Sequence, residues 1–89
     1  MEYEFVKFPT SVRSLSEELV RCTNDYYSRK IGNDEISEII KWYASKCADL
    51  LFRGQDYSPT LKKIIGQRRL RLLDHILEDY EFNRFKGVK

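Results

Sequence analysis

The chain has 89 residues, which is enough for one small domain and leaves little room for two. Hydrophobic residues make up 42% and charged residues 34%, with 16 basic against 14 acidic side chains, a composition that excludes a disordered chain of low hydrophobicity and high net charge. No run of 18 apolar residues is present, and residues 1–8 carry no apolar stretch of signal-peptide length, so we expect a cytoplasmic protein without a membrane span.

Residues 1–9 differ in pattern from the rest of the chain. Four apolar side chains are interrupted by charged ones, at Tyr3, Phe5, Val6 and Phe8. This alternation, closed by Pro9, predicts a short extended arm. Because one short strand is not stable alone, we expect the arm either to lie across the helices or to pair with a partner chain.

A first helix is predicted over residues 10–30. Thr10, Ser11 and Ser14 can each act as its N-cap, and Ser14 lies three residues before Glu17, which is the spacing of a capping box. The apolar positions step by three and four along one helix face, at Val12, Leu15, Leu19, Cys22 and Tyr26. Arg29 and Lys30 suit the negative end of the helix, and Gly32 follows it.

A second helix is predicted over residues 33–53, with Asn33 or Asp34 as its cap and Gly54 as its stop. Its apolar face is formed by Ile36, Ile39, Ile40, Tyr43, Cys47, Leu50 and Leu51. The connection to the first helix is short, so the two helices should lie antiparallel.

A third helical segment is predicted over residues 58–82, with Ser58 as N-cap and Pro59 at the first helical position. The apolar positions before and after Gly66 do not share one phase, so we expect a kink or a break at that glycine. Residues 83–89 are predicted to be a frayed tail.

These elements predict an all-α fold in a single domain over residues 1–89. The expected architecture is a small antiparallel three-helix bundle with a short extended N-terminal arm. The third helix is broken near Gly66, so that four helices result if the break is complete.

Residues suited to catalysis or metal binding are scarce. His75 is the only histidine, and its neighbour Asp74 cannot form a relay with it because adjacent helical residues point in different directions. Cys22 and Cys47 fall on core-facing positions, where we expect buried free thiols; a disulfide would need an oxidising compartment. The glycines are isolated, so no phosphate-binding loop is present. We therefore expect no enzyme activity, no metal and no cofactor.

Positive charge concentrates in residues 62–71, which contain five basic side chains and no acidic one. Basic residues around a turn glycine resemble a helix-turn-helix, in which such side chains neutralise phosphates. The candidates for nucleic acid or an acidic partner are Lys62, Lys63, Arg68, Arg69 and Arg71. At 100° per residue these side chains point around the helix, so the simpler interpretation is a solvated helix face.

Aromatic residues form 13% of the chain, which is more than so small a core can readily hide. In adjacent pairs such as Tyr26-Tyr27 and Trp42-Tyr43, the two rings of a pair cannot both face the core. Outward aromatic side chains would form a protein-binding patch. The candidates are Tyr27, Trp42, Phe52 and Tyr57. The alternative is that the bundle wraps these rings under its own loops.

One segment resembles a known family. Tyr57-Ser58-Pro59, followed by Ile64-Ile65-Gly66-Gln67-Arg68-Arg69-Leu70 and Leu73-Asp74, is similar to a family of small uncharacterised helical proteins from Firmicutes, in which a Tyr-Thr-Pro-like start leads to a Leu-Gly-Lys-Lys-Arg-Leu-like core. The stretch from Leu19 to Tyr27 and the turn before Glu35 are also similar, so the similarity spans most of the chain. It departs from the family in the N-terminal arm and in having Arg where the family tends to have Lys. It implies a bacterial or phage origin and a helical fold, and it brings no activity or catalytic residues.

The sequence favours a small non-enzymatic regulatory or adaptor protein that binds another protein, or a second copy of itself as a homodimer. The alternative is a nucleic-acid-binding helical module that uses residues 62–71. The two hypotheses differ in salt dependence, because binding to phosphates releases counterions.

Overall fold

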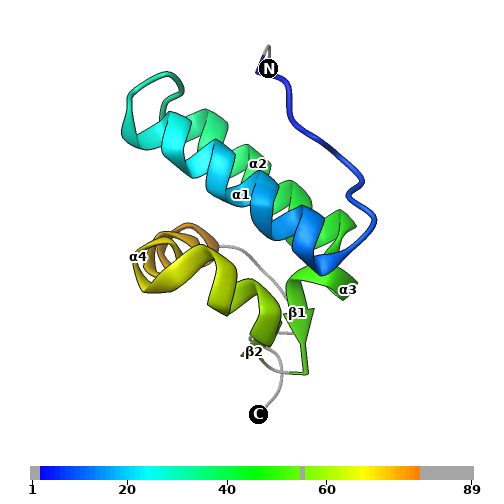
Figure 1. The fold of residues 1–89 in the computed structure, drawn as a ribbon. Helices are drawn as coiled ribbons and strands as arrows, with labels where there is room; N and C mark the ends of the chain where they lie inside the picture. The colour runs from blue at the N-terminus through cyan, green and yellow to red at the C-terminus, as the bar shows by residue number, and fades with distance from the viewer. Residues whose placement is uncertain (1–2, 55, 79–89) are drawn as a thin grey trace.

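The computed structural model describes residues 3–54 and 56–78. Most of this part is helical, and it confirms the all-α class. α1 and α2 lie side by side and antiparallel, and α4 packs against both of them (Figure 1). In chain order the elements are α1 (Val12–Tyr27), α2 (Asn33–Lys46), α3 (Ala48–Leu51), β1 (Phe52–Arg53), β2 (Asp56–Tyr57) and α4 (Pro59–Leu77).

α1 is shorter at both ends than the predicted range of 10–30. Ser11 is the N-cap, and its hydroxyl accepts a hydrogen bond from the backbone N–H of Ser14 over 3.0 Å. After Tyr27 the chain turns through Arg29, which adopts a left-handed φ of 68°. The N–H groups of Arg29 and Lys30 donate to carbonyls of the last helical turn, so a non-glycine residue occupies the position that glycine usually takes in this C-cap.

The helix predicted over 33–53 is divided in the structure. α2 begins after Gly32, whose N–H donates to the Glu35 carboxylate over 2.8 Å, and it ends at Lys46. At Cys47 the backbone leaves helical geometry, with φ −124° and ψ 35°. One helical turn, α3, follows, and the chain then forms a small antiparallel hairpin in which Phe52 pairs with Tyr57. The hairpin turns at Gly54, whose φ of 67° suits glycine.

α4 begins at Pro59, with Ser58 as its N-cap as predicted. The expected break is present, because Gly66 has φ 86° and ψ 167° and divides the element into two helical pieces. The remainder of the predicted helix beyond residue 78 and the predicted tail over 83–89 lie outside the described residues.

One hydrophobic core joins the three long helices and the hairpin. The helix faces predicted from periodicity supply most of it, and both cysteines are buried in it as free thiols. Its side chains are Leu15, Leu19, Cys22, Ile31, Ile36, Ile39, Ile40, Tyr43, Ala44, Cys47, Leu51, Phe52, Tyr57, Leu61, Ile65, Leu70, Leu73 and Leu77.

Among the residues that the structure describes, no helix combines the length and the apolar character that crossing a membrane would need.

Candidate functional site

The extended arm, residues 3–9, is fixed to α1 and α2 through its backbone. The N–H of Val6 donates to the Glu18 carboxylate over 2.9 Å, and Arg21 donates to the carbonyl of Glu4 over 3.0 Å. From α2, the Tyr43 hydroxyl donates to the carbonyl of Val6. Side chains of two helices therefore satisfy backbone groups that a partner strand would otherwise satisfy.

Glu18 is the central anchor of this contact on α1. Its side chain is only 11% exposed, and the Arg21 guanidinium contacts both of its oxygens, at 2.5 and 3.2 Å. Burial raises the pKa of this carboxyl, but the hydrogen bonds from Arg21 and from the N–H of Val6 outweigh it, and the net pKa lies below the usual value. The ionised carboxylate is thus the form that holds the arm.

Four aromatic rings meet where the arm crosses α2. Phe5 packs edge-to-face on Trp42 and Tyr43, at centroid distances of 6.5 and 5.7 Å. Phe8 also packs edge-to-face on Trp42, at a centroid distance of 5.6 Å. The Trp42 indole N–H donates to the carbonyl of Lys7 over 2.9 Å. Trp42 is consequently packed under the arm and only partly exposed.

The outer side of the arm exposes apolar surface. Val6 is 51% exposed and Phe8 is 67% exposed, and they are the large hydrophobic side chains that residues 3–54 and 56–78 leave open to solvent. Lys7 and Lys46 place their ammonium groups 5.9 and 5.7 Å from the Trp42 ring. We call this surface the arm face; it consists of Val6, Lys7, Phe8, Trp42 and Lys46.

Sequence reasoning missed Val6 and Phe8, the exposed hydrophobic members of the arm face. The spacing of the apolar residues in the arm indicates this exposure. Tyr3 and Phe5 occupy odd positions, whereas Val6 and Phe8 occupy even positions. Successive side chains of an extended segment point to opposite sides, so these pairs cannot all face the helices. The odd pair packs on the core and the even pair points outward.

Two aromatic candidates do not lie on the surface as we expected. Phe52 is 2% exposed and Tyr57 is 4% exposed, because the hairpin stacks their rings at 5.4 Å and turns both toward the core. The Tyr57 hydroxyl donates to Asp74 over 2.8 Å. Burial, and then this hydrogen bond to a carboxylate, raise the pKa of Tyr57. These residues hold the hairpin against α4.

The basic residues of 62–71 are not brought together in one stripe. Lys62 is paired with Asp56 at 2.5 Å. Arg69 donates to the Thr23 hydroxyl over 2.7 Å, to the side-chain oxygen of Asn24, and to the carbonyl of Ile65. Arg69 therefore joins α4 to α1 at the edge of the core, and its guanidinium group donates its hydrogen bonds within the molecule.

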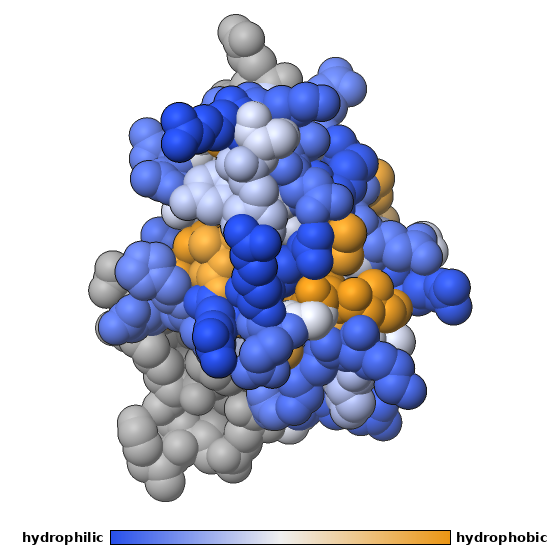
Figure 2. All heavy atoms as spheres, turned by 60° about the vertical axis from the view of Figure 1, so that its left-hand side comes forward, coloured by the Kyte–Doolittle hydropathy of each residue, from blue (hydrophilic) through white to orange (hydrophobic). Residues whose placement is uncertain are grey.

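Arg68 lies over the ring of Tyr27, with its guanidinium carbon 4.3 Å from the ring centroid. Tyr27 is thus covered by an arginine and is half-buried, while Lys63 and Arg71 are exposed. Figure 2 shows the side of the molecule toward which the α1–α2 turn and the bend of α4 project, and hydrophilic residues cover most of it, with small hydrophobic areas between them. This surface differs in character from the arm face.

No constellation for metal chemistry is formed by the residues that the structure describes, since no three His, Cys, Asp or Glu side chains gather at a common point. His75 lies 3.7 Å from Glu78 at the solvent-exposed side of α4. Cys22 is fully buried, and this burial raises the pKa of its thiol to about 11. The thiol is therefore protonated at neutral pH and a poor nucleophile.

Among the comparisons with known proteins, the family models give a match to this chain. No curated protein and no solved structure matches it. A family model described as a conserved hypothetical protein matches residues 6–78, which include the outward half of the arm and every helix of the bundle. The chain belongs to this family of conserved hypothetical proteins, CLB_0814_fam.

Proposed function

We propose that this protein is a small, non-enzymatic regulatory or adaptor protein that binds another protein through the arm face. The observation that carries the proposal is the exposure of Val6 and Phe8 beside the partly exposed ring of Trp42. Aromatic side chains at the centre of a contact supply most of the binding free energy in protein interfaces.

The anchoring of the arm supports this proposal. A loose peptide would lose conformational entropy on binding, whereas this segment is already held by Glu18, Arg21, Trp42 and Tyr43. Since the backbone is fixed, Phe8 is presented to a partner in one position. The helices thus act as the scaffold and the arm as the contact.

The charges around the arm face define the partner's chemistry. Lys7 and Lys46 flank the Trp42 ring, and both are exposed. A partner that complements them presents an apolar side chain flanked by carboxylates, because opposite charges at the rim steer association and exclude competitors. We therefore expect an acidic and apolar segment of another protein.

Nucleic-acid binding is the alternative proposal, and fewer observations favour it. Lys62 and Arg69 form contacts within the molecule, so Lys63, Arg68 and Arg71 are the basic residues that would contact nucleic acid. Such binding would weaken steeply with salt, and binding through the arm face would not.

We also propose a cytoplasmic protein of Firmicutes or their phages. The origin is supported by the resemblance of residues 57–74 to helical proteins of that group. The two buried free thiols, Cys22 and Cys47, support a reducing compartment.

The test is selection of random peptides displayed on phage against the immobilised wild-type protein. We expect enriched peptides to carry aliphatic or aromatic residues flanked by Asp or Glu. These peptides should bind the variant Phe8→Ser at least about tenfold more weakly, since truncation at a contact centre costs 1.4 kcal/mol or more, an order-of-magnitude estimate. The double variant Lys7→Glu, Lys46→Glu should also lose binding.

Arg68→Glu is the matched control, because it reverses a charge outside the arm face and should leave peptide binding unchanged. The proposal is contradicted if the enriched peptides bind Phe8→Ser as well as wild type. Salt-sensitive binding to duplex DNA that Arg68→Glu abolishes and Phe8→Ser retains would favour the alternative. Self-association that Phe8→Ser abolishes, measured by light scattering, would identify the partner as a second copy of this chain.

A further inference from the structure

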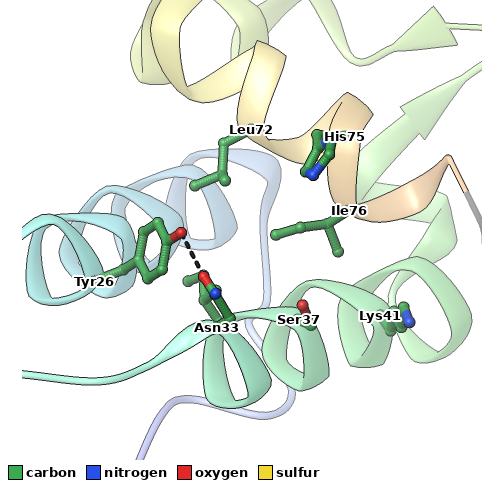
Figure 3. A pocket seen from close by; sticks show the side chains of 8 residues that line it. Tyr26, Asn33, Ser37, Lys41, Leu72, His75 and Ile76 are labelled. Atoms are coloured by element: carbon green, nitrogen blue, oxygen red, sulfur yellow. Dashed lines mark hydrogen bonds between the residues drawn. The ribbon is translucent and has the colours of Figure 1, made fainter. Parts of the chain in front are cut away.

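A pocket of about 410 Å³ opens between the end of α1, residues 33–41 of α2 and the second half of α4. This volume falls within the range of small-molecule sites. Figure 3 shows Tyr26 and Asn33 at one end, Ser37 and Lys41 along α2, and Leu72, His75 and Ile76 on α4. The pocket shares no residue with the arm face and is independent of the proposed function.

The two long walls differ in character because of residue spacing. Asn33, Ser37 and Lys41 follow one another at intervals of four, so they share one face of α2. Leu72 and Ile76 stand four apart on α4 and form the apolar wall. Ile36, which is 1% exposed, also lines the pocket. The pocket is therefore polar on one side and apolar on the other.

The polar side of the pocket offers donors. The Tyr26 hydroxyl donates to the side-chain oxygen of Asn33 over 2.6 Å, which occupies that oxygen and leaves the amide N–H₂ as the free part of the side chain. Ser37 adds a hydroxyl. Lys41 adds an ammonium group that forms no ion pair within residues 3–54 and 56–78.

Among the described residues that line the pocket, none is acidic. Beside the pocket, the Glu78 carboxylate lies 3.7 Å from Nδ1 of His75. Polar donors, a lysine that forms no ion pair with the described residues, and an apolar wall together favour an anion that carries a hydrocarbon part.

We propose that this pocket binds a small amphipathic organic anion. Its carboxylate or phosphate group is held by Lys41 and Ser37, and its apolar part packs on Leu72 and Ile76. The carboxylate and phosphate forms use the same donors, and the experiment distinguishes them.

The test is titration of the whole, ¹⁵N-labelled chain with four probes: octanoate, octyl phosphate, inorganic phosphate and 1-octanol. We expect octanoate or octyl phosphate to cause saturable amide shifts in both Asn33–Lys41 and Leu72–Ile76, and the tighter of the two identifies the head group. Inorganic phosphate and octanol should each bind at least about tenfold more weakly. Inorganic phosphate lacks the apolar part, and octanol lacks the anionic group.

Lys41→Gln should weaken binding of the better probe about tenfold or more, because it removes the charge-assisted contact. Lys63→Gln is the matched control, since it removes an exposed lysine on α4 that does not line the pocket. Ser37→Ala is a second variant that should weaken binding without altering charge. The proposal is overturned if octanol binds as tightly as octanoate, if no probe produces saturable shifts in these segments, or if Lys41→Gln binds like Lys63→Gln.

Discussion

The indole nitrogen of Trp42 donates a hydrogen bond to the carbonyl oxygen of Lys7 over 2.9 Å, across 35 positions of sequence. This contact joins the arm to α2 at the centre of the arm face. Trp42 is also the only tryptophan in the chain, so its fluorescence reports on this one place. Detachment of the arm would expose the indole to water and shift its emission to longer wavelength.

Acid should release the arm before it unfolds the helices. The pKa of Glu18 is lowered in the folded protein, so its contribution to stability is present above the unfolded-state pKa and is lost as pH falls through the folded-state pKa. We expect a red shift of Trp42 emission below about pH 4.3, the ordinary pKa of glutamate. Far-ultraviolet circular dichroism should show the helices retained at the start of that shift.

The variant Glu18→Gln should show the shifted emission already at neutral pH and no further acid step in fluorescence. Glu17→Gln is its matched control, because Glu17 is exposed and, within the described part of the chain, pairs only with Arg13. An unchanged acid transition in Glu18→Gln would show that another group controls the arm.

Removal of the Arg69 guanidinium should destabilise the fold. Arg69→Met breaks hydrogen bonds to the buried Thr23 and to Asn24, and it should lower the free energy of unfolding by about 2 kcal/mol. Arg69→Lys should recover only part of this, because an ammonium group lacks the forked geometry. In urea denaturation Arg71→Met, at an exposed position, should change stability by less than about 0.5 kcal/mol. Equal effects at the two positions would contradict the structural role of Arg69.

The break in α4 should make Gly66 intolerant of any side chain. Its φ of 86° and ψ of 167° lie in a region that is essentially restricted to glycine, so Gly66→Ala should cost about 2–3 kcal/mol. Gly54→Ala is the comparison, since φ 67° is left-handed helical and should cost only about 1 kcal/mol. At both sites an added Cβ atom would meet no described atom within 4 Å beyond the adjacent residues and the local helix backbone, so contacts with the rest of the fold do not explain the difference. Equal costs in thermal or urea unfolding would contradict this backbone geometry.

A glycine at position 29 should stabilise the protein. Arg29 has φ 68°, a conformation that costs a non-glycine residue about 1–2 kcal/mol. Arg29→Gly removes that cost but adds about 0.4–1 kcal/mol of unfolded-chain entropy, so the net gain should be about 0.5 kcal/mol. A small rise in the midpoint of urea unfolding is the expected result, and a fall would show that the arginine side chain makes a compensating contact.

The fold class was predictable from sequence because helical periodicity runs through long segments. Leu15, Leu19 and Cys22 share one face by spacing alone, and all three are buried. The break at Gly66 was likewise visible as a change of phase between the apolar positions on either side. Short elements carry no such pattern, so β1 was absorbed into the predicted second helix, and β2 fell in the unassigned stretch before the predicted third helix.

The candidate site was less predictable, because it depends on contacts between residues far apart in sequence. Arg69 looked like a free cation until its partner Thr23, 46 positions away, was placed beside it. Phe52 and Tyr57 looked like surplus aromatics, yet the turn at Gly54 stacks them into the core. Neither outcome follows from spacing along one helix.

The most direct test of the arm face is titration of the protein with one selected acidic and apolar peptide while Trp42 emission is recorded. Binding at the arm face should cover the indole and produce a saturable blue shift in the wild-type protein. The variant Phe8→Ser should show little or no shift at the same peptide concentrations. If fluorescence polarisation of a labelled peptide shows saturable binding while Trp42 emission stays unchanged, the partner binds elsewhere and the proposed function is contradicted.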